Sequence, residues 1–195
     1  RNMIGAVVGV QPFGGLGLSG TGPKAGGPLY LRRLVRTRAP FRFPADMRQT
    51  LPGPTGENNE IEFRPRGVVA CIADDERSLR TQARLAQSLG NIALMLRSHL
   101  TLGIRHGVDA ARLQLVDALD GLAIDAVLLD LPEPRAAQWR RQLAFSEGRI
   151  VPVIVPDSEG NYDAARLVVE RTVTTNTAAA GGNAHLLAIA ADESG

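Results

Sequence analysis

The apolar pattern between positions 67 and 156 constrains the fold more than any other feature of this chain. Short runs rich in valine, isoleucine, leucine and alanine read "GVVACIA", "IALMLR", "DAVLLDL" and "IVPVIVP". Between them lie longer stretches with apolar residues at helical spacing, which read "SLRTQARLAQSLG", "DAARLQLVDALDG" and "PRAAQWRRQLAFSEG". Buried strands that alternate with helices are typical of βαβ units, so we predict an α/β domain with a parallel sheet of about four strands.

The rest of the chain divides into three parts with different patterns. Residues 1–38 hold nine of the 21 glycines, followed by the apolar and basic run "PLYLRRLVR", which we interpret as strand-like. Residues 39–66 have little periodicity and contain the turn-forming string "LPGPTGENNE", which indicates a connector. Residues 157–195 predict a turn, a strand in "ARLVVERTVTTN" and a tail of small residues.

The composition argues against several function classes. The formal net charge is +2, and the arginines are dispersed without interleaved aromatic residues, so we expect no nucleic-acid binding. The single cysteine, Cys71, excludes an internal disulfide and indicates a reducing compartment. We find neither a signal peptide nor a transmembrane stretch. The expected location is cytoplasmic, or membrane-peripheral through a longer parent protein.

The glycine-rich opening contains a pattern that resembles a dinucleotide fingerprint. Gly15, Gly17 and Gly20 satisfy G-x-G-x-x-G and follow the strand-like string "GAVVGV". A functional fingerprint opens a helix and is followed by an acidic residue about 20 positions later. Here "TGPKAGGP" follows, which disfavours a helix, and the next acidic residue is Asp46. We therefore expect these glycines to permit positive φ and close packing rather than to hold a phosphate.

Longer strings in the chain resemble a known family. "GAVVGVQPFGG" followed by "LSGTGPKAGGPLYLRRL" resembles the end of the catalytic domain of an aldehyde dehydrogenase. More narrowly, it is similar to the glutamate semialdehyde dehydrogenase module of the bacterial bifunctional proline-catabolic enzymes, the proline utilization A family. "LPGPTGENN" and "RLVVERTVTTNTAAAGGNAHLLAI" match the same family in order. The resemblance implies the end of an aldehyde dehydrogenase domain, a Rossmann-like parallel-sheet domain over 67–156 without a nucleotide fingerprint, and a β-type C-terminal tail.

The resemblance also implies particular site residues. In the family, the loop before the Pro-Phe-Gly-Gly string binds the substrate carboxylate through two consecutive backbone N–H groups, and the matching positions are Gly5 and Ala6. Two adjacent amides aimed at one anion form a small nest, which a large side chain would obstruct. Phe13 matches the phenylalanine that packs beside the aldehyde-bearing chain. An apolar wall there would position the substrate and exclude water.

The resemblance implies that the parent enzyme oxidises L-glutamate γ-semialdehyde to glutamate with a cysteine nucleophile and NAD. NAD would bind upstream, as would FAD in a proline dehydrogenase domain if one is present. Cys71 lies in an apolar strand pattern, so we expect a buried structural cysteine. We expect no catalytic, cofactor-binding or metal-binding residue in this chain, which is predicted to be inactive alone and to have a larger part of the domain upstream.

The middle domain carries acidic residues where a nucleotide-binding fold needs bare amides. Its first strand-to-helix turn reads "IADDERS", and Asp74, Asp75 and Glu76 would repel a phosphate at the helix N-terminus. The family resemblance assigns such a domain a structural role, covering the channel between two active sites. The tail is expected to dock against the upstream dehydrogenase domain or to make homo-oligomer contacts.

The remaining candidates have ordinary structural interpretations. His99, His106 and His185 lack partners at metal-ligand spacing, so we expect surface or packing roles. Trp139 is expected to pack a helix on the sheet. One alternative of another class remains open, a standalone Rossmann-like binding or regulatory module that recognises a small molecule or a protein partner.

Overall fold

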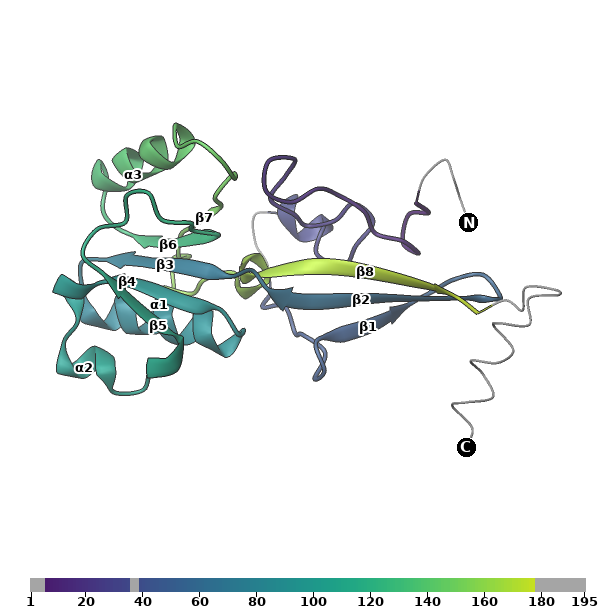
Figure 1. The fold of residues 1–195 in the computed structure, drawn as a ribbon, viewed down its shortest axis with the longest axis horizontal. Helices are drawn as coiled ribbons and strands as arrows, with labels where there is room; N and C mark the ends of the chain where they lie inside the picture. The colour runs from purple at the N-terminus through teal and green to yellow at the C-terminus, as the bar shows by residue number, and fades with distance from the viewer. Residues whose placement is uncertain (1–5, 36–38, 178–195) are drawn as a thin grey trace.

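The computed structural model describes residues 6–35 and 39–177, which form two β-sheets joined end to end (Figure 1). The strands are β1 (Arg48–Leu51), β2 (Glu57–Pro65), β3 (Val68–Ala73), β4 (Ile92–Leu96), β5 (Leu113–Val116), β6 (Ala126–Asp130), β7 (Val153–Ile154) and β8 (Val168–Asn176). The α-helices are α1 (Glu76–Ser88), α2 (Leu102–Arg105) and α3 (Arg135–Ala144). Short 3-10 helices are η1 (Leu31–Arg33), η2 (Arg97–His99), η3 (Ala110–Arg112) and η4 (Ala164–Leu167).

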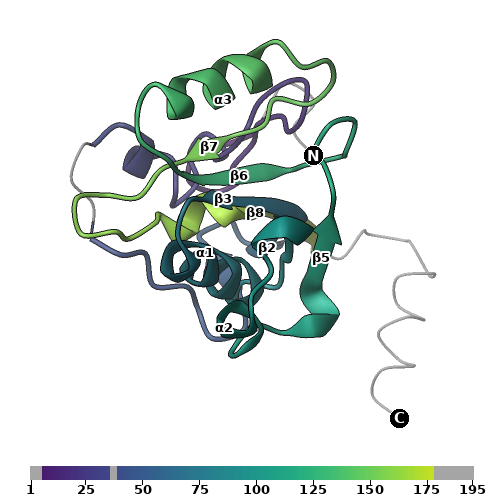
Figure 2. The same ribbon diagram turned by 90° about the vertical axis from the view of Figure 1, so that its left-hand side faces the viewer.

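The larger sheet confirms the α/β fold class. Its strands run in the order β5-β4-β3-β6-β7, and every neighbouring pair is parallel. Helices α1 and α2 lie on one face of this sheet and α3 on the other (Figure 2). The sheet has five strands, more than the sequence pattern suggested.

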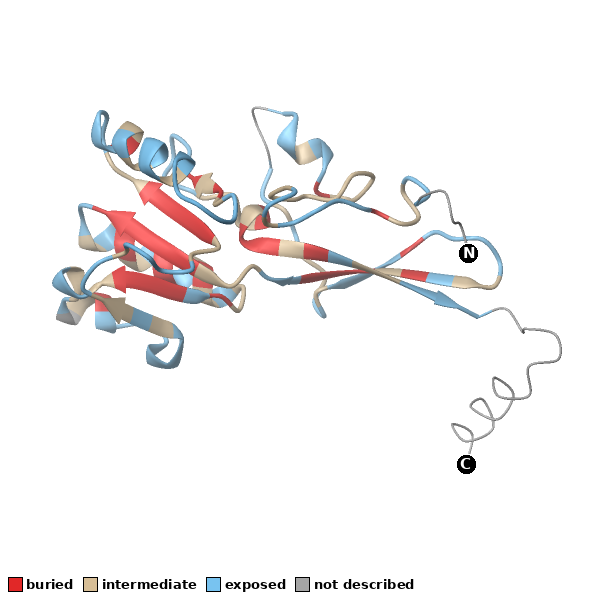
Figure 3. Ribbon diagram, turned by 45° about the horizontal axis from the view of Figure 1, so that its top comes forward, coloured by how far each residue is buried: buried red, intermediate tan, exposed pale blue. Residues whose placement is uncertain are grey.

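Each face of the parallel sheet has its own core. On one face, Leu79, Ala83 and Ala86 recur along α1 at helical spacing and pack against alternate residues of the central strands. On the other face, Trp139 of α3 packs against a second buried cluster, which confirms its expected role. Figure 3 shows these central strands as the most continuously buried part of the chain. Strands buried on both faces explain the apolar runs of the sequence.

One predicted helix is wrong. The stretch "DAARLQLVDALDG" forms η3 and then β5, which pairs in parallel with β4. Leu113 and Leu115 pack against the α1-side core, whereas Val116 packs against the opposite core. Helical and strand periodicities are hard to distinguish over so short an apolar run. The open edge of β4 favours the strand, because it supplies partners for the backbone hydrogen bonds.

The smaller sheet is antiparallel, with the order β1-β2-β8. The predicted strand in "ARLVVERTVTTN" is confirmed as β8, which pairs with β2 from Glu57–Asn176 to Pro65–Val168. The sequence pattern of residues 39–66 predicted a connector without strands, but β1 and β2 lie there. The polarity of "ENNEIEFRP" concealed β2, because Asn59 is fully buried and accepts a hydrogen bond from the Thr174 hydroxyl.

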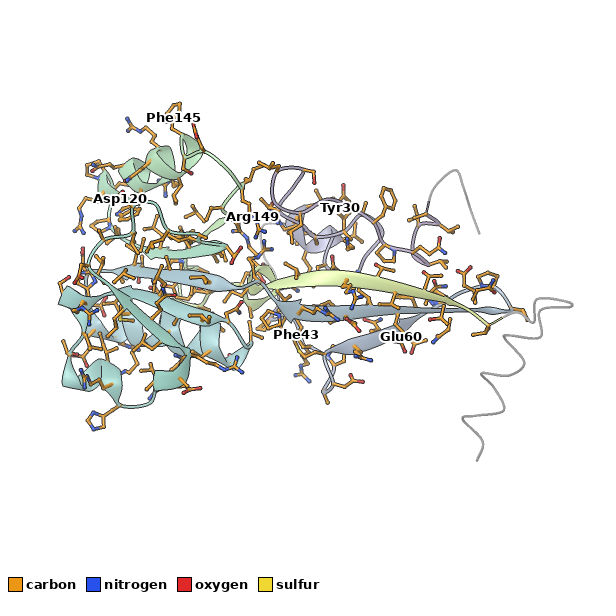
Figure 4. The ribbon with its side chains drawn as sticks, viewed as in Figure 1. Tyr30, Phe43, Glu60, Asp120, Phe145 and Arg149 are labelled. Atoms are coloured by element: carbon orange, nitrogen blue, oxygen red, sulfur yellow. The ribbon has the colours of Figure 1, made fainter. Side chains whose placement is uncertain are left out.

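An aromatic cluster adds to the core of this sheet. The rings of Phe41 and Phe43 lie 5.7 and 5.5 Å from the ring of Phe63 on β2, centroid to centroid. Figure 4 shows Phe43 and Tyr30 on opposite sides of the ribbon formed by β2 and β8. The sheet is therefore covered from two directions, by the aromatic segment and by the N-terminal segment.

The N-terminal segment contains no strand between residues 6 and 35, contrary to the strand-like interpretation of "GAVVGV" and "PLYLRRLVR". It folds back on itself through isolated bridges that pair Phe13 with Ala25 and Leu16 with Thr21. The second of the two strings contains η1 instead. Pro12 and Pro28 lack the amide hydrogen that a strand ladder requires, which explains the irregular path.

The two sheets meet at Gly67, between β2 and β3. This residue has a φ of +132°, and a Cβ here would collide with the Asp125 carboxylate. Its N–H donates to the side-chain oxygen of buried Asn91, 3.0 Å away, whose side-chain amide in turn donates to Ala86 and Leu167. Asn91 therefore holds the end of α1, the start of β3 and the approach to β8 together. In the described ranges, no helix is long and apolar enough to cross a membrane.

Candidate functional site

The glycine-rich loop is fixed to the antiparallel sheet by a buried carboxylate. Glu170 of β8 is 8% exposed, and its two oxygens accept hydrogen bonds from the backbone N–H groups of Lys24 and Leu29, at 2.6 and 3.4 Å. A Cβ on Gly27 would lie 2.9 Å from the Glu170 carboxylate, so glycine permits this approach. The Thr172 hydroxyl also donates to the Pro12 carbonyl at 2.7 Å. Contacts with β8, a strand about 140 residues later in the chain, therefore determine the conformation of the loop.

The sequence-predicted substrate residues lie at the start of this loop. Gly5 is outside the described residues. Ala6 is exposed, and Phe13 has half of its surface exposed. The backbone of Phe13 pairs with Ala25 through two hydrogen bonds, of 3.2 and 2.7 Å. The structure thus holds the Phe13 backbone in place while leaving its ring open to a further partner.

Exposed apolar side chains concentrate in the same segment. Of the 14 large hydrophobic residues exposed in the described part of the chain, nine lie between residues 7 and 35. Leu18, Val8, Leu31 and Leu34 are the most exposed of these, at 71–77%. Apolar surface of this density is typical of a surface that another polypeptide covers.

The G-x-G-x-x-G pattern does not build a nucleotide site in this fold. The loop after Gly20 enters the bridge at Thr21, and the first helical turn begins only at Leu31. A phosphate cradle of the dinucleotide type requires a helix N-terminus directly after the glycines. The prediction that these glycines serve conformation and close packing is consistent with the positive φ angles of Gly17 and Gly20 and with the Ser19 side chain, which a Cβ on Gly15 would meet.

The turn between β3 and α1 is also unsuited to the pyrophosphate of NAD or FAD. Asp75 caps α1 by accepting a hydrogen bond from the Ser78 N–H at 2.9 Å, which lowers the pKa of Asp75. Asp74 forms a two-point ion pair with Arg135, at 2.7 and 2.8 Å. Glu76 accepts a hydrogen bond from the Thr101 hydroxyl. Carboxylates therefore take the place that a phosphate would need, and the Rossmann-like domain does not fit a dinucleotide there.

Cys71 is not a nucleophile in this structure. It lies in the centre of β3 at 2% exposure, and burial raises the pKa of its thiol to about 12. A reactive cysteine needs an exposed thiolate with a lowered pKa. The expected structural role is confirmed.

No group of histidine, cysteine and acidic residues in residues 6–35 and 39–177 could hold a metal ion. His99 is half-buried in η2 and His106 is exposed after α2. His185 lies outside the described residues.

A basic pocket is present that the sequence did not predict. It lies between the glycine-rich loop and the segment 163–170, and Arg33, Arg66 and Glu170 are among its lining residues. Arg33, Arg66 and Glu170 lie in three distant parts of the sequence, and none of these parts contains a recognisable binding motif. The alternation of Val168 and Glu170 on the buried face of β8 is the one sequence signal that points there.

Comparison with known proteins identifies relatives along almost the whole chain. "Bifunctional protein PutA" of Salmonella typhimurium is 38% identical over 244 residues, covering 97% of this chain and 18% of that protein. A 1-pyrroline-5-carboxylate dehydrogenase of Bacillus thuringiensis is 64% identical over 31 residues, which are 16% of this chain and 6% of that protein. No protein-family model matches the chain.

A solved structure supports the fold over a similar extent. Proline utilization A from Corynebacterium freiburgense matches with a TM-score of 0.53 at 18% identity, covering 91% of this chain and 20% of that chain. This chain thus spans less than a quarter of the length of its PutA relatives. Sequence identity of 38% across 97% of the chain and a shared fold lead to one conclusion: the chain belongs to the proline utilization A family.

Proposed function

We propose that this chain is part of a bifunctional proline-catabolic enzyme that oxidises L-glutamate γ-semialdehyde to glutamate with NAD. The observation that carries the proposal is the 38% identity to a bifunctional PutA protein across 97% of the chain. In this proposal the chain contributes a substrate anchor and a structural domain. The reactive cysteine, NAD and the FAD of a proline dehydrogenase domain belong to the remainder of the parent protein.

The anchor consists of the backbone N–H groups of Gly5 and Ala6, with Phe13 as an apolar wall. Two adjacent amides bind and orient the substrate carboxylate, so that the aldehyde carbon at the other end meets the nucleophile. Phe13 packs along the aliphatic part of the substrate and excludes water. Its half-exposed ring, on a backbone held by Ala25, supports this role because the ring is positioned yet still lacks a complete pocket.

The residues of this chain support the proposal that NAD binds in another part of the parent protein. NAD would accept the hydride in the reaction, and neither the G-x-G-x-x-G loop nor the turn between β3 and α1 offers its pyrophosphate an open helix N-terminus. The acidic turn at Asp74, Asp75 and Glu76 supports this proposal, since its carboxylates repel phosphate. These carboxylates instead cap α1 and form the ion pair with Arg135. The isolated chain is therefore proposed to be inactive.

The Rossmann-like domain is proposed to cover the channel between the two active sites. The apolar residues exposed in 7–35 would face the upstream dehydrogenase domain, because a surface of this kind is costly to leave in water. The C-terminal tail, beyond the described residues, is proposed to contribute homo-oligomer contacts.

The substitution Ala6→Leu in the full-length enzyme tests the anchor. The larger side chain obstructs the approach of the carboxylate, and loss of charge-assisted hydrogen bonds should raise the KM for the semialdehyde about tenfold or more. The KM for NAD should stay unchanged. Ala111→Leu, an exposed alanine in η3, is the matched control and should behave as wild type. An unchanged semialdehyde KM in Ala6→Leu would refute the anchor assignment.

A further inference from the structure

The basic pocket beside the glycine-rich loop is not used by the proposed dehydrogenase function. It has a cavity volume of about 40 Å³, which is large enough for a small polar group or a few water molecules. Five basic residues line it: Lys24, Arg32, Arg33, Arg66 and Arg166. The acidic residues in its lining are Asp163 and Glu170. Positive charge therefore exceeds negative charge around a small, partly enclosed space.

Two of these guanidinium groups are held next to each other by the backbone. Arg33 donates from Nη1 to the Gly22 carbonyl at 3.0 Å, and Arg66 donates from Nη2 to the Thr21 carbonyl at 2.9 Å. Because Thr21 and Gly22 are consecutive, the two guanidinium groups lie at the same place on the loop. Arg66 is further fixed by a hydrogen bond from Nε to the Arg166 carbonyl. Both groups are thus positioned by neutral carbonyls.

No ion pair within the described residues joins Arg33 or Arg66 to a carboxylate. Arg32 pairs with Asp163 through Nη2 at 3.4 Å, but its Nε is buried and has no hydrogen-bond partner in the described part of the chain, so it adds a donor. A buried N–H of a charged group without an acceptor is costly. The arrangement therefore contains donors and charge that an anion in the pocket would satisfy.

The electrostatics of the pocket agree with its geometry. Burial lowers the pKa of Arg66, and the nearby charge of Arg33 lowers it further, against a weaker opposing effect of Asp125. Glu170 makes its hydrogen bonds to the backbone of the loop rather than to Arg33 or Arg66. Its oxygens already accept the N–H groups of Lys24 and Leu29, and burial raises its pKa despite these bonds. The pocket is thus electropositive in a place that water screens only in part.

We propose that this pocket binds the phosphate group of a small molecule, held by Arg33 and Arg66 with Arg32 beside them. A phosphate carries close to two negative charges and several acceptor oxygens, so it matches paired guanidinium groups better than a carboxylate with its single charge. Gly14, Gly15 and Gly22 also line the pocket and add no side chain to its wall. This site is separate from the Gly5–Ala6 anchor and does not depend on the proposed oxidation of the semialdehyde.

The test is titration of inorganic phosphate into the full-length parent enzyme at constant ionic strength, followed by calorimetry and by the shift in Tm. Saturable binding is expected, with acetate binding more weakly. Arg33→Gln should weaken phosphate binding about tenfold or more, because an exposed arginine can be replaced without disturbing the core. Arg33→Lys should recover part of the affinity through its charge.

Arg84→Gln is the matched control, because Arg84 is exposed and also donates to main-chain carbonyls, those of His106 and Gly107. It should bind phosphate as wild type does. The proposal is overturned by any of three results: no saturable phosphate binding, equal affinity in Arg33→Gln and wild type, or acetate binding as tight as phosphate. Phosphate that binds at another site of the enzyme would bind Arg33→Gln and wild type with equal affinity, so this outcome also overturns the proposal.

Discussion

At the residue scale, Glu170 contributes most to the geometry of the candidate site. One buried carboxylate on β8 binds two backbone N–H groups of the N-terminal loop and thereby sets the path of the loop that carries Phe13. Gly27 makes this contact possible, since a side chain there would meet the carboxylate. The position of Glu170 could not be predicted from sequence, because its partners are main-chain atoms that any residue provides.

Glu170→Gln is expected to change the pH dependence of stability. Burial raises the pKa of Glu170 above its ordinary value of 4.5, although the N–H groups of Lys24 and Leu29 act in the opposite direction. The folded chain therefore holds this proton to higher pH than the unfolded chain. The stabilising effect is complete below pH 4.5 and is lost as the pH rises through the raised pKa.

The glutamine variant lacks this titration. Its Tm, measured by scanning calorimetry from pH of about 4 to about 7, should rise relative to that of wild type as the pH increases. If the Tm of wild type instead rises relative to that of the variant over the same pH interval, the direction of the pKa shift is wrong.

At the scale of elements, the sequence predicts the buried parallel strands and two helices well. It fails for elements that are stabilised by contacts with distant parts of the chain. β3, β4, β6 and α1 were predictable because each carries a pattern of its own. β5 could not be predicted because it forms by pairing with the edge of β4. β2 could not be predicted because its buried Asn59 is stabilised by a hydrogen bond from the Thr174 hydroxyl of β8. Polar residues in buried positions are satisfied by tertiary contacts, which no local pattern contains.

The N-cap of α1 gives a prediction at this scale. Asp75→Ala removes the acceptor of the Ser78 N–H and should lower the free energy of unfolding by about 1 kcal/mol in urea titrations. Asp75→Asn, which retains a capping oxygen, should keep most of the stability. Hydrogen bonding to Ser78 lowers the pKa of Asp75, so the contribution of the cap in wild type should fade as the pH falls through that lowered pKa. Equal stability of the alanine and asparagine variants would contradict the cap.

At the scale of the whole molecule, two sheets with different tasks share one junction. The parallel sheet has helices on both faces and a core on each (Figure 2). The N-terminal segment beside the antiparallel sheet instead leaves nine large apolar side chains exposed between residues 7 and 35. The family could be predicted from strings such as "QPFGG" and "TNTAAAGGN". The basic pocket could not be predicted, since the fold brings Arg33, Arg66 and Glu170 together from distant parts of the sequence.

The central claim is that this chain supplies the substrate side of a dehydrogenase whose nucleophile and NAD lie in another part of the same protein. The most direct measurement is the formation of NADH from NAD with L-glutamate γ-semialdehyde, by the chain alone and by the chain co-expressed with the upstream dehydrogenase segment. We predict no NADH from the chain alone and restored activity in the co-expressed pair. NADH formation by the isolated chain, or an inactive complex of the two folded parts, would contradict the account.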